Sequence, residues 1–268
     1  MRRLSAEELR ELEPHCVGLA ALHSPTTGVV DFAAVAEALE VDLRASDVPV
    51  VTDCEVIGVR RRSRDLEVQH AKGTTAARLV VFCAGAWSDV LAERAGAPRD
   101  PRIVPFVGRY LYLRSKPARL VRSLIYPVPD PSLPFLGVHL TRHIDGRVSV
   151  GPTAMLQPRL RSLTWPGTWR MARRLWRPGL VELRHAFSNR ALASAATRYV
   201  PELTPDDFEG GFAGVRAQAL ARNGSLLDDF VISHTERALH VRNAPSPAAT
   251  SSLAIARLIA DRAEKALD

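Results

Sequence analysis

The sequence predicts a mixed α/β (α+β) fold that combines a parallel β-sheet layer with an antiparallel β-sheet and its helices. Three stretches predict this fold. Residues 76–96 contain a continuous apolar run, a small-residue turn and a helix pattern closed by Gly96, which is typical of a buried parallel sheet. Between residues 98 and 150, alternating apolar positions bordered by prolines favour an antiparallel sheet. Near the end, a buried-looking strand over residues 238–243 leads through Pro-Ser-Pro into an alanine-rich helix.

The first hundred residues predict helices and strands in alternation. Ser5 and Glu8 form a capping box for a short polar helix, which Pro14 ends. A second helix is expected from Asp31 to about Arg44. The expected elements are a helix over 5–13, a strand and a turn within 18–31, the helix from 31, and strands over 48–61 and 66–71, the latter followed by a turn at Lys72-Gly73.

The rest of the chain adds strands on either side of one helical region. Residues 165–199 are rich in arginine and predict helix, with Pro178 and Gly179 breaking the run. Ser246 is expected to be the N-cap of the last helix and Pro247 its first residue, because proline has no N–H to lose there and a preset φ. The expected strands lie within 104–114, 124–129, 134–143, 147–153, 209–220, 228–234 and 238–243.

Composition restricts the possible functions. Hydrophobic residues make up 46% and charged residues 24% of the chain, which is ordinary for a globular protein and argues against disorder. The net charge is +7, but nearly all of the positive charge is scattered arginine, so we expect a solvated surface rather than a nucleic-acid interface. Cys16, Cys54 and Cys83 are too far apart to predict a disulfide framework or a metal site. Without a secretory signal or an apolar run that could span a bilayer, the expected location is cytoplasmic.

Three stretches carry a resemblance to a known family: 81–89 (VFCAGAWSD), 211–219 (GFAGVRAQA) and 240–254 (HVRNAPSPAATSSLA). Together they resemble the FAD-dependent oxidoreductases of the D-amino-acid oxidase superfamily, and within it the L-2-hydroxyglutarate oxidase/dehydrogenase branch. The resemblance runs nearly from end to end. Further stretches similar to that branch are 23–31, 100–110, 126–141 and 151–155.

The resemblance implies an FAD cofactor and the residues that bind it. The amides around Ala248, Ala249 and Thr250 are expected to face the flavin N1–C2=O edge, because the first turn of a helix presents unpaired donors to developing negative charge. Their small side chains let the ring approach. The alternative is a capped C-terminal helix that binds nothing. The other residues implied in cofactor binding are Val56, through its backbone at the adenine, Cys83, Ala84 and Gly85 near the adenosine–pyrophosphate portion, and Gly214, Ser246 and Pro247.

Members of the family open with a strand, a Gly-x-Gly-x-x-Gly turn and a helix that bind the pyrophosphate, and these 268 residues contain no such motif. The parallel layer is therefore expected to be the remnant of an FAD-binding Rossmann-like layer, in a chain that lacks roughly 150 N-terminal residues of the family. We expect 28–97 and 206–268 to form the remaining FAD-binding portion, and 1–27 and 98–205 the substrate-binding sheet and helices. The missing N-terminal half could be a separate partner chain, and the truncated chain could be inactive alone.

Oxidation of a 2-hydroxy acid needs a hydride acceptor, a base for the hydroxyl proton and cations for the carboxylates. Arg216 is the candidate carboxylate clamp, because a guanidinium can bind a carboxylate through two hydrogen bonds; the alternative is a surface salt bridge. His139 is the candidate base, since it lies on an apolar strand expected to border the substrate pocket; the alternative is a structural core histidine. Tyr126 is expected to line that pocket, or to be structural because a proline follows it.

The resemblance implies oxidation of L-2-hydroxyglutarate to 2-oxoglutarate by hydride transfer to flavin. Two alternatives stay open: a non-catalytic remnant or half of a split flavoprotein, and an amino-acid or glycerol-3-phosphate oxidoreductase of the same superfamily. The electron acceptor is equally open between oxygen, another carrier and a quinone reached through a peripheral membrane contact. No metal ion and no nucleic acid is expected.

Overall fold

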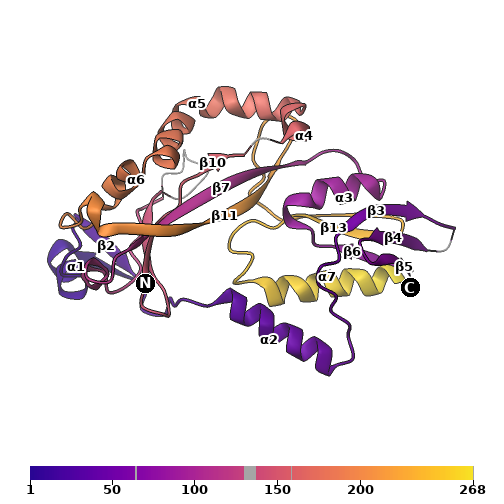
Figure 1. The fold of residues 1–268 in the computed structure, drawn as a ribbon, viewed down its shortest axis with the longest axis horizontal. Coiled ribbons are helices and arrows are strands. Elements are labelled where there is room, and N and C mark those ends of the chain that lie inside the picture. Colours follow the sequence, from indigo (N-terminus) through magenta and orange to yellow (C-terminus); the bar gives the residue numbers. More distant parts are fainter. Residues whose placement is uncertain (64, 130–136, 158, 268) are drawn as a thin grey trace. The chain divides into compact units, whose positions relative to one another are not determined.

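The computed structural model describes every residue except 64, 130–136, 158 and 268 (Figure 1). The chain divides into two compact units, and each unit is assembled from three separate segments. We call them unit 1 and unit 2. Unit 1 comprises Met1–Asp31, Phe106–Gln157 and Leu175–Arg216, and unit 2 comprises Phe32–Pro105, Pro158–Arg174 and Ala217–Asp268. The assignment of cofactor binding to 28–97 and 206–268, and of substrate binding to 1–27 and 98–205, stays a prediction.

Unit 1 is built around an antiparallel sheet with the strand order β10-β7-β9-β8, and β11 also pairs with β7. The pairs β10 with β7, β7 with β9, and β8 with β9 are all antiparallel, as the proline-bordered alternation predicts. A separate pair joins β1 to β2. The strands are β1 (Arg2–Ser5), β2 (Ala20–His23), β7 (Arg102–Leu113), β8 (His139–Arg142), β9 (Val148–Gly151), β10 (Met155–Leu156) and β11 (Phe208–Leu220).

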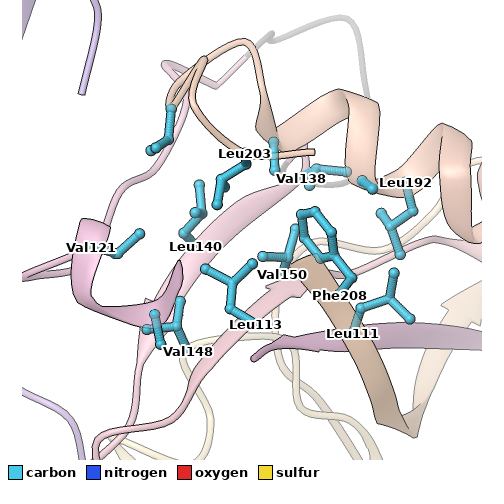
Figure 2. Packing of buried hydrophobic residues seen from close by; sticks show 14 residues of the cluster. Leu111, Leu113, Val121, Val138, Leu140, Val148, Val150, Leu192, Leu203 and Phe208 are labelled. Carbon is cyan, nitrogen blue, oxygen red and sulfur yellow. The ribbon is translucent and has the colours of Figure 1, made fainter. Parts of the chain in front are cut away.

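Helices α6 and η2 contribute to the core of this sheet, whereas α1 packs against β1 and β2. Leu192, Ala193 and Ala196 on one face of α6 pack against buried side chains of β7, β8 and β9, as Figure 2 shows for Leu192, Leu111 and Val150. Each fully buried aliphatic side chain of this kind contributes about 1.5–3 kcal/mol to folding. The helices are α1 (Ala6–Leu12), η2 (Pro117–Leu120), the second part of α5 (Pro166–Phe187) and α6 (Asn189–Ala196).

Unit 2 contains two three-stranded sheets. One has the order β12-β13-β6, in which β13 and β6 are parallel, and the other is the antiparallel meander β3-β4-β5. Helix α3 packs against β6, β13 and β3, and the cluster formed by Leu66, Phe82, Leu91, Ala95 and Ala238 lies between them. The strands of unit 2 are β3 (Val56–Arg61), β4 (Leu66–His70), β5 (Gly73–Ala77), β6 (Val80–Phe82), β12 (Val231–Thr235) and β13 (Ala238–Asn243). Its helices are α2 (Phe32–Ala45), η1 (Gly85–Trp87), α3 (Ser88–Arg94), α4 (Leu160–Leu163) and α7 (Ser252–Leu267). The short helix η3 (Pro205–Asp207) belongs to unit 1.

The predicted mixed α/β fold is confirmed, and so are several of its elements. Ser5 caps α1, and Glu8 completes the capping box. Strand β6 (Val80–Phe82), a short turn and helix α3 follow one another as expected, with Gly96 at a φ of +90° after the helix. The strand expected to run on from residue 76 is interrupted at residues 78–79, because Ala76 and Ala77 belong to β5. The second helix runs from Phe32 to Ala45, one residue inside the expected start. Local signals of this kind depend only on neighbouring residues, so the sequence is sufficient to predict them.

Helix α5 does not break at Pro178 and Gly179 as expected. It continues from Pro166 to Phe187, and its only non-helical backbone conformation is at Leu175, with φ −110° and ψ 19°. A proline ring inside a helix clashes with the carbonyl four residues earlier, here that of Arg174. The helix therefore accommodates Pro178 by a kink one turn before it.

The final helix begins later than expected. It starts at Ser252, and residues 244–251 form a loop of turns, so the prediction of Ser246 as N-cap and Pro247 as first helical residue is wrong. The amide of Ala248 donates to the carbonyl of Pro245, three residues back, instead of entering a helical ladder. Small residues fit a turn as readily as a helix, and only tertiary packing distinguishes the two.

Two strand predictions also need correction, and one strand was missed. The stretch 124–129 forms a single bridge, between Ile125 and Leu140, because its two prolines lack the N–H groups of a ladder. In the stretch 48–61 the strand begins only at Val56, after Asp53 with a φ of +51°. Strand β1 was not expected at all. Part of the predicted strand 134–143, residues 134–136, lies outside the described residues.

Candidate functional site

The predicted cofactor-binding stretches of unit 2 meet at one edge of a sheet. Strand β6 pairs in parallel with β13, and Phe82 lies opposite His240. Both strands therefore end at the same side, where the turn 83–85 follows β6 and the loop 244–251 follows β13 (Figure 1). Open α/β sheets bind ligands at the carboxyl ends of their parallel strands. We call this side of unit 2 the carboxyl edge.

The turn at 83–85 is shaped by its glycine. Gly85 has a φ of +51°, a conformation that favours glycine, and a Cβ added there would meet no atom within 4 Å. The amide of Trp87 donates to the carbonyl of Ala84, which leads the chain into α3. Partial desolvation raises the pKa of the Cys83 thiol, so this cysteine stays protonated at neutral pH. Ala84 and Val56 both pack against the unit 2 core cluster, which brings these two predicted residues to one region.

The loop 244–251 offers open amides at the carboxyl edge. Among the described residues, no hydrogen-bond partner meets the amides of Ala249 and Thr250, and both residues are exposed. The amide of Ala248 is already paired with Pro245, so it is not available to a ligand. Ser246 and Pro247 are exposed in the same loop. Two unpaired donors near a helix start suit an electron-rich ligand edge, and the role of the loop stays a prediction.

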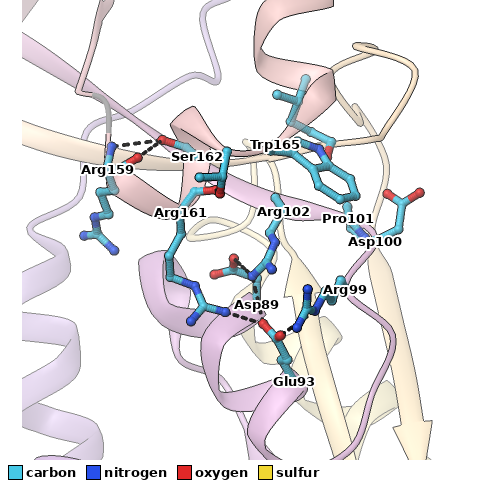
Figure 3. Close-up of polar contacts among 12 residues, drawn as sticks. Asp89, Glu93, Arg99, Asp100, Pro101, Arg102, Arg159, Arg161, Ser162 and Trp165 are labelled. Carbon is cyan, nitrogen blue, oxygen red and sulfur yellow. Dashed lines mark hydrogen bonds and ion pairs between the residues drawn. The ribbon is translucent and has the colours of Figure 1, made fainter.

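A charge cluster with Arg102 and Asp89 buried at its centre supports helix α3, the element that follows the turn. The guanidinium of Arg102 lies 3.3 Å from the Asp89 carboxylate and 2.9 Å from that of Glu93, both on α3 (Figure 3). Glu93 also pairs with Arg99, at 2.7 Å, and with Arg161. Partial burial alone would raise the pKa of Glu93, but the three guanidinium groups, Arg102 first, hold it below its usual value. The cluster fixes α3 against the start of β7.

Two buried polar residues fix the end of β13, directly before the loop 244–251. Arg242, 2% exposed, donates to the carbonyl of Asp100 at 2.8 Å and to that of Pro101 at 2.6 Å. The side-chain amide of Asn243 donates to the carbonyls of Leu227 and Asp229. Sequence reasoning did not single out these residues. Their signal was a pair of strongly polar residues inside an otherwise apolar strand.

His240 is a structural residue of the core rather than a candidate catalytic residue. Its side chain is fully buried, stacks on Phe82 with ring centroids 5.3 Å apart, and places Nε2 3.2 Å from Oγ1 of Thr235. Burial, followed by the positive charge of Arg242, lowers the pKa of His240 to about 4. It is therefore a neutral structural residue of β13 at physiological pH.

The predicted substrate residues lie in unit 1. His139, on β8, is buried, and its Nδ1 lies 3.0 Å from the carbonyl oxygen of Gly137. Its ring stacks on the half-exposed ring of Tyr126 with centroids 4.3 Å apart, and Tyr110 meets it edge-on at 6.5 Å. The contact to Gly137 assigns the proton of a neutral imidazole to Nδ1, so Nε2 keeps its lone pair. Among the described residues, no hydrogen-bond partner meets Nε2.

Arg216 is close enough to His139 to influence its charge. Burial is the main reason that the pKa of His139 is lowered; the hydrogen bond to Gly137 opposes this, and the positive charge of Arg216 adds to the lowering. Arg216 is half-buried on β11, and Gly214 lies two residues before it on the same strand, where an added Cβ would meet nothing within 4 Å. The structure thus brings a neutral base, a stacked tyrosine and a guanidinium together within unit 1.

This arrangement can bind a carboxylate and accept a proton. A guanidinium supplies fixed positive charge, while a neutral imidazole with a free lone pair can act as a base near pH 7. The part of the chain that the structure describes contains no group of three or more side chains placed to hold a metal ion. It also contains no helix with the length and apolar character required to cross a membrane.

Comparison with known proteins fits this arrangement. A family model described as FAD dependent oxidoreductase (DAO) matches residues 1–262 of the chain. The chain belongs to this family. Its cofactor is accordingly FAD, and the features at the carboxyl edge that fit it are the two parallel strand ends, the positive φ of Gly85 and the open amides of the loop 244–251.

Several curated relatives carry the same name. L-2-hydroxyglutarate dehydrogenase of Indibacter alkaliphilus is 39% identical over 98% of this chain and 70% of its own length. The mitochondrial enzyme of that name from Nematostella vectensis is 42% identical over 95% of this chain, and the human one is 38% identical over 99%. The chain covers 63% and 64% of these last two. It therefore spans about two thirds of the length of the curated relatives it matches.

Solved structures confirm the fold. L-alpha-glycerophosphate oxidase from Mycoplasma pneumoniae, a structure with FAD bound, superposes with a TM-score of 0.72 at 22% identity and covers 99% of this chain and 64% of its own. Glycine oxidase from Geobacillus kaustophilus superposes with a TM-score of 0.66 at 20% identity, over 98% of this chain and 63% of its own. At these identities the likeness concerns the fold alone.

Proposed function

We propose that this chain forms part of an enzyme that oxidises a 2-hydroxy acid, L-2-hydroxyglutarate, to 2-oxoglutarate with FAD. The observation that carries the proposal is the placement of His139 in unit 1, buried, neutral, stacked on Tyr126 and next to the charge of Arg216. The curated relatives named L-2-hydroxyglutarate dehydrogenase support this choice of substrate.

In this proposal Arg216 binds a substrate carboxylate, and the planar guanidinium fixes its orientation through two hydrogen bonds. Nε2 of His139 accepts the proton of the 2-hydroxyl group, since Nδ1 is committed to the carbonyl of Gly137. The aromatic ring of Tyr126 keeps the imidazole in place and excludes water from one of its faces. When bound, FAD supplies the acceptor for the hydride that leaves C2, which makes the product a 2-oxo acid.

The lowered pKa of His139 supports the role of base. A histidine that stays neutral below its ordinary pKa of 6.5 can accept a proton throughout the physiological range. Burial also removes competing water from the imidazole, so the hydroxyl proton has few other acceptors. Among the described residues Nδ1 of His139 is paired with the carbonyl of Gly137 and Nε2 has no partner, so Nε2 is available as the proton acceptor.

The proposal also covers the source of the pyrophosphate-binding amides, the cellular location and the electron acceptor. The amides that bind the FAD pyrophosphate come from polypeptide outside these 268 residues, because no Gly-x-Gly-x-x-Gly occurs among them. A separate partner chain is one source of that polypeptide. The enzyme works in the cytoplasm and passes electrons to a carrier, for which a quinone at a membrane surface is one candidate.

The test is anaerobic mixing of the chain with FAD and L-2-hydroxyglutarate. The chain is used alone and together with the part of the Indibacter relative that lies outside its match to this chain. Bleaching of the flavin absorbance by the L-enantiomer, with 2-oxoglutarate formed in equal amount, is the expected result. The controls are D-2-hydroxyglutarate, L-glutamate and glycerol 3-phosphate. Faster bleaching by an amino acid or by glycerol 3-phosphate would overturn the proposed substrate.

A further inference from the structure

Strand β11 changes face between Phe208 and Phe212. Successive side chains of a strand point to opposite faces of its sheet, so residues four apart in a regular strand share a face. Phe208 packs in the core of unit 1 with Leu111 (Figure 2). Phe212 instead stacks on Tyr110 of β7, with ring centroids 4.6 Å apart and an angle of 7° between the rings. Because Tyr110 directly precedes Leu111, Tyr110 and Phe212 lie on the face away from this core.

Two glycines produce this change of face. Gly210 has a φ of +45° and Gly211 a φ of +128°, and both values lie in the region that favours glycine. A Cβ added to Gly211 would collide with the carbonyl oxygen of Tyr110, so glycine is required where β11 approaches β7. Irregularities of this kind, as in a β-bulge, re-aim a side chain within a sheet. Here the re-aimed side chain is that of Phe212.

Phe212 lies at the centre of an aromatic cluster, which we define as Phe212, Tyr110, Tyr112 and His143. Besides Tyr110, the Phe212 ring contacts Tyr112, with centroids 5.5 Å apart, and His143, edge-on with centroids 6.4 Å apart. Nε2 of His143 lies 2.8 Å from Oγ of Ser149, which fixes this imidazole in turn. Three neighbouring rings therefore hold Phe212 in place, although the residue is 42% exposed.

Tyr110 connects the aromatic cluster to the proposed base. Its ring meets the His139 ring edge-on, with centroids 6.5 Å apart. The imidazole of His139 also stacks on the half-exposed Tyr126, and its Nδ1 is anchored to the carbonyl of Gly137. Stacked and edge-on aromatic pairs have preferred geometries, so each ring restricts the rotation of the next. The contacts thus run from Phe212 through Tyr110 to His139.

We propose that Phe212 is a positioning residue: stacked on Tyr110, it fixes the orientation of the His139 imidazole and so the direction in which Nε2 accepts the hydroxyl proton. The inference rests on the proposed function, because it takes His139 as the base. A general base must lie within hydrogen-bond reach of the proton that it accepts, and a misplacement of about 1 Å can cost about 100-fold in rate. A merely structural Phe212 would only cover the sheet, and another apolar side chain of similar size would replace it.

Three substitutions separate the aromatic ring from its bulk. F212Y keeps the stacking ring, F212L keeps an apolar side chain without a ring, and F212A removes both. In the FAD-loaded enzyme, F212A should lower kcat by about tenfold and change KM for L-2-hydroxyglutarate by less than about twofold, since Arg216 binds the carboxylate in the proposed function. F212L should lose nearly as much, whereas F212Y should stay within about twofold of the wild type. F32A is the matched control that leaves kcat unchanged, because Phe32 of unit 2 is 43% exposed.

An NMR titration of the 268-residue chain alone gives a readout that does not depend on activity. Burial is the main reason that the pKa of His139 is lowered, and the positive charge of Arg216 adds to the lowering. F212A frees the Tyr110 ring and admits water to the imidazole, so the pKa of His139 should rise toward 6.5. F212Y should keep the wild-type pKa. The His139 signal is identified by its loss in H139Q.

A lower kcat in F212A and F212L, recovery in F212Y and a raised pKa of His139 in F212A together support the inference. Wild-type kcat in F212L, equal losses in F212Y and F212A, or an unchanged titration of His139 in F212A would each overturn it. Urea unfolding identifies a variant that is not folded, and F212L takes the place of F212A in the titration in that case. A wild-type enzyme that leaves L-2-hydroxyglutarate unoxidised would refute the proposed substrate, while the titration still decides whether Phe212 holds His139.

Discussion

Acidification should destabilise unit 2 through His240 well before the carboxylates are protonated. The imidazole is fully buried, and within the part of the chain that the structure describes its Nδ1 has no hydrogen-bond partner, while Nε2 lies 3.2 Å from Oγ1 of Thr235. A proton on Nδ1 would therefore be a buried donor without an acceptor, next to the charge of Arg242. These conditions explain why the pKa lies near 4 in the folded chain, compared with 6.5 in an unfolded one.

The magnitude follows from the difference between the two pKa values. As the pH falls through 6.5, the unfolded chain binds a proton at His240 that the folded chain refuses until about pH 4. Stability is thus lost between pH 6.5 and 4, and the loss attributable to this group levels off below. About 2.5 pKa units correspond to a loss on the order of 3 kcal/mol. That is a large fraction of the stability of a typical domain.

Urea unfolding between pH 7.5 and 4 measures this loss, with H240Q as the matched control that cannot titrate. The variant loses packing at every pH, so the quantity compared is the slope of stability against pH. Tryptophan fluorescence is a suitable signal because Trp165 is buried in unit 2 and donates to the carbonyl of Leu220. Equal slopes for both proteins, or an NMR titration of His240 with a pKa of 6 or above, would refute the reasoning.

Four further predictions concern the site and its support. In the FAD-loaded enzyme, R216A should lower kcat/KM by about 30-fold or more, which corresponds to about 2–5 kcal/mol of transition-state binding. R216K should recover only part of this loss, and the flavin content of both variants should be unchanged. Loss of flavin along with activity would assign Arg216 to the cofactor instead. H139Q should lower kcat by about 100-fold or more. The acid limb of the wild-type pH profile should lie below pH 6.5, since the base must be neutral and burial lowers the pKa of His139. An acid limb above pH 6.5 would contradict this role. D89N should cost about 3–5 kcal/mol in urea unfolding, because it removes the charge of the buried partner of Arg102 and leaves only the partly exposed Glu93. A change below about 1 kcal/mol would show that Glu93 compensates. Titration followed by flavin absorbance should show far weaker FAD binding by the chain alone than by the Indibacter relative, and stoichiometric, tightly held FAD would disprove it.

Elements with strong local signals could be predicted from the sequence. The capping box of Ser5 and Glu8, the strand and turn before α3, and the positive φ of Gly96 each depend on a few adjacent residues. The same holds for the antiparallel strands, whose alternation is visible in the sequence. The kink at Leu175 follows from Pro178, but whether the helix bends or ends there is decided by packing.

The supports of the candidate site could not be predicted in this way. Arg242 binds carbonyls of Asp100 and Pro101, which lie more than 140 positions away in the sequence. Nothing near Arg242 in the chain indicates that its charge will be buried. The structure of the loop 244–251 could not be predicted either, since its small residues are compatible with both a helix and turns. Long-range packing, which is not visible in the sequence, determines both the burial of Arg242 and the turns of the loop 244–251.

The pairing of β6 with β13 also determines when this protein can fold during synthesis. Val80 finds its partner at Ala238, so the parallel pair forms only after the ribosome has added nearly all of the remaining chain. At 5–20 residues per second this delay is on the order of 10 to 30 seconds. Throughout that interval β6 is an apolar strand without its partner β13. The nascent chain should therefore need a chaperone at this segment, and a ribosome stalled before β13 should expose it to aggregation.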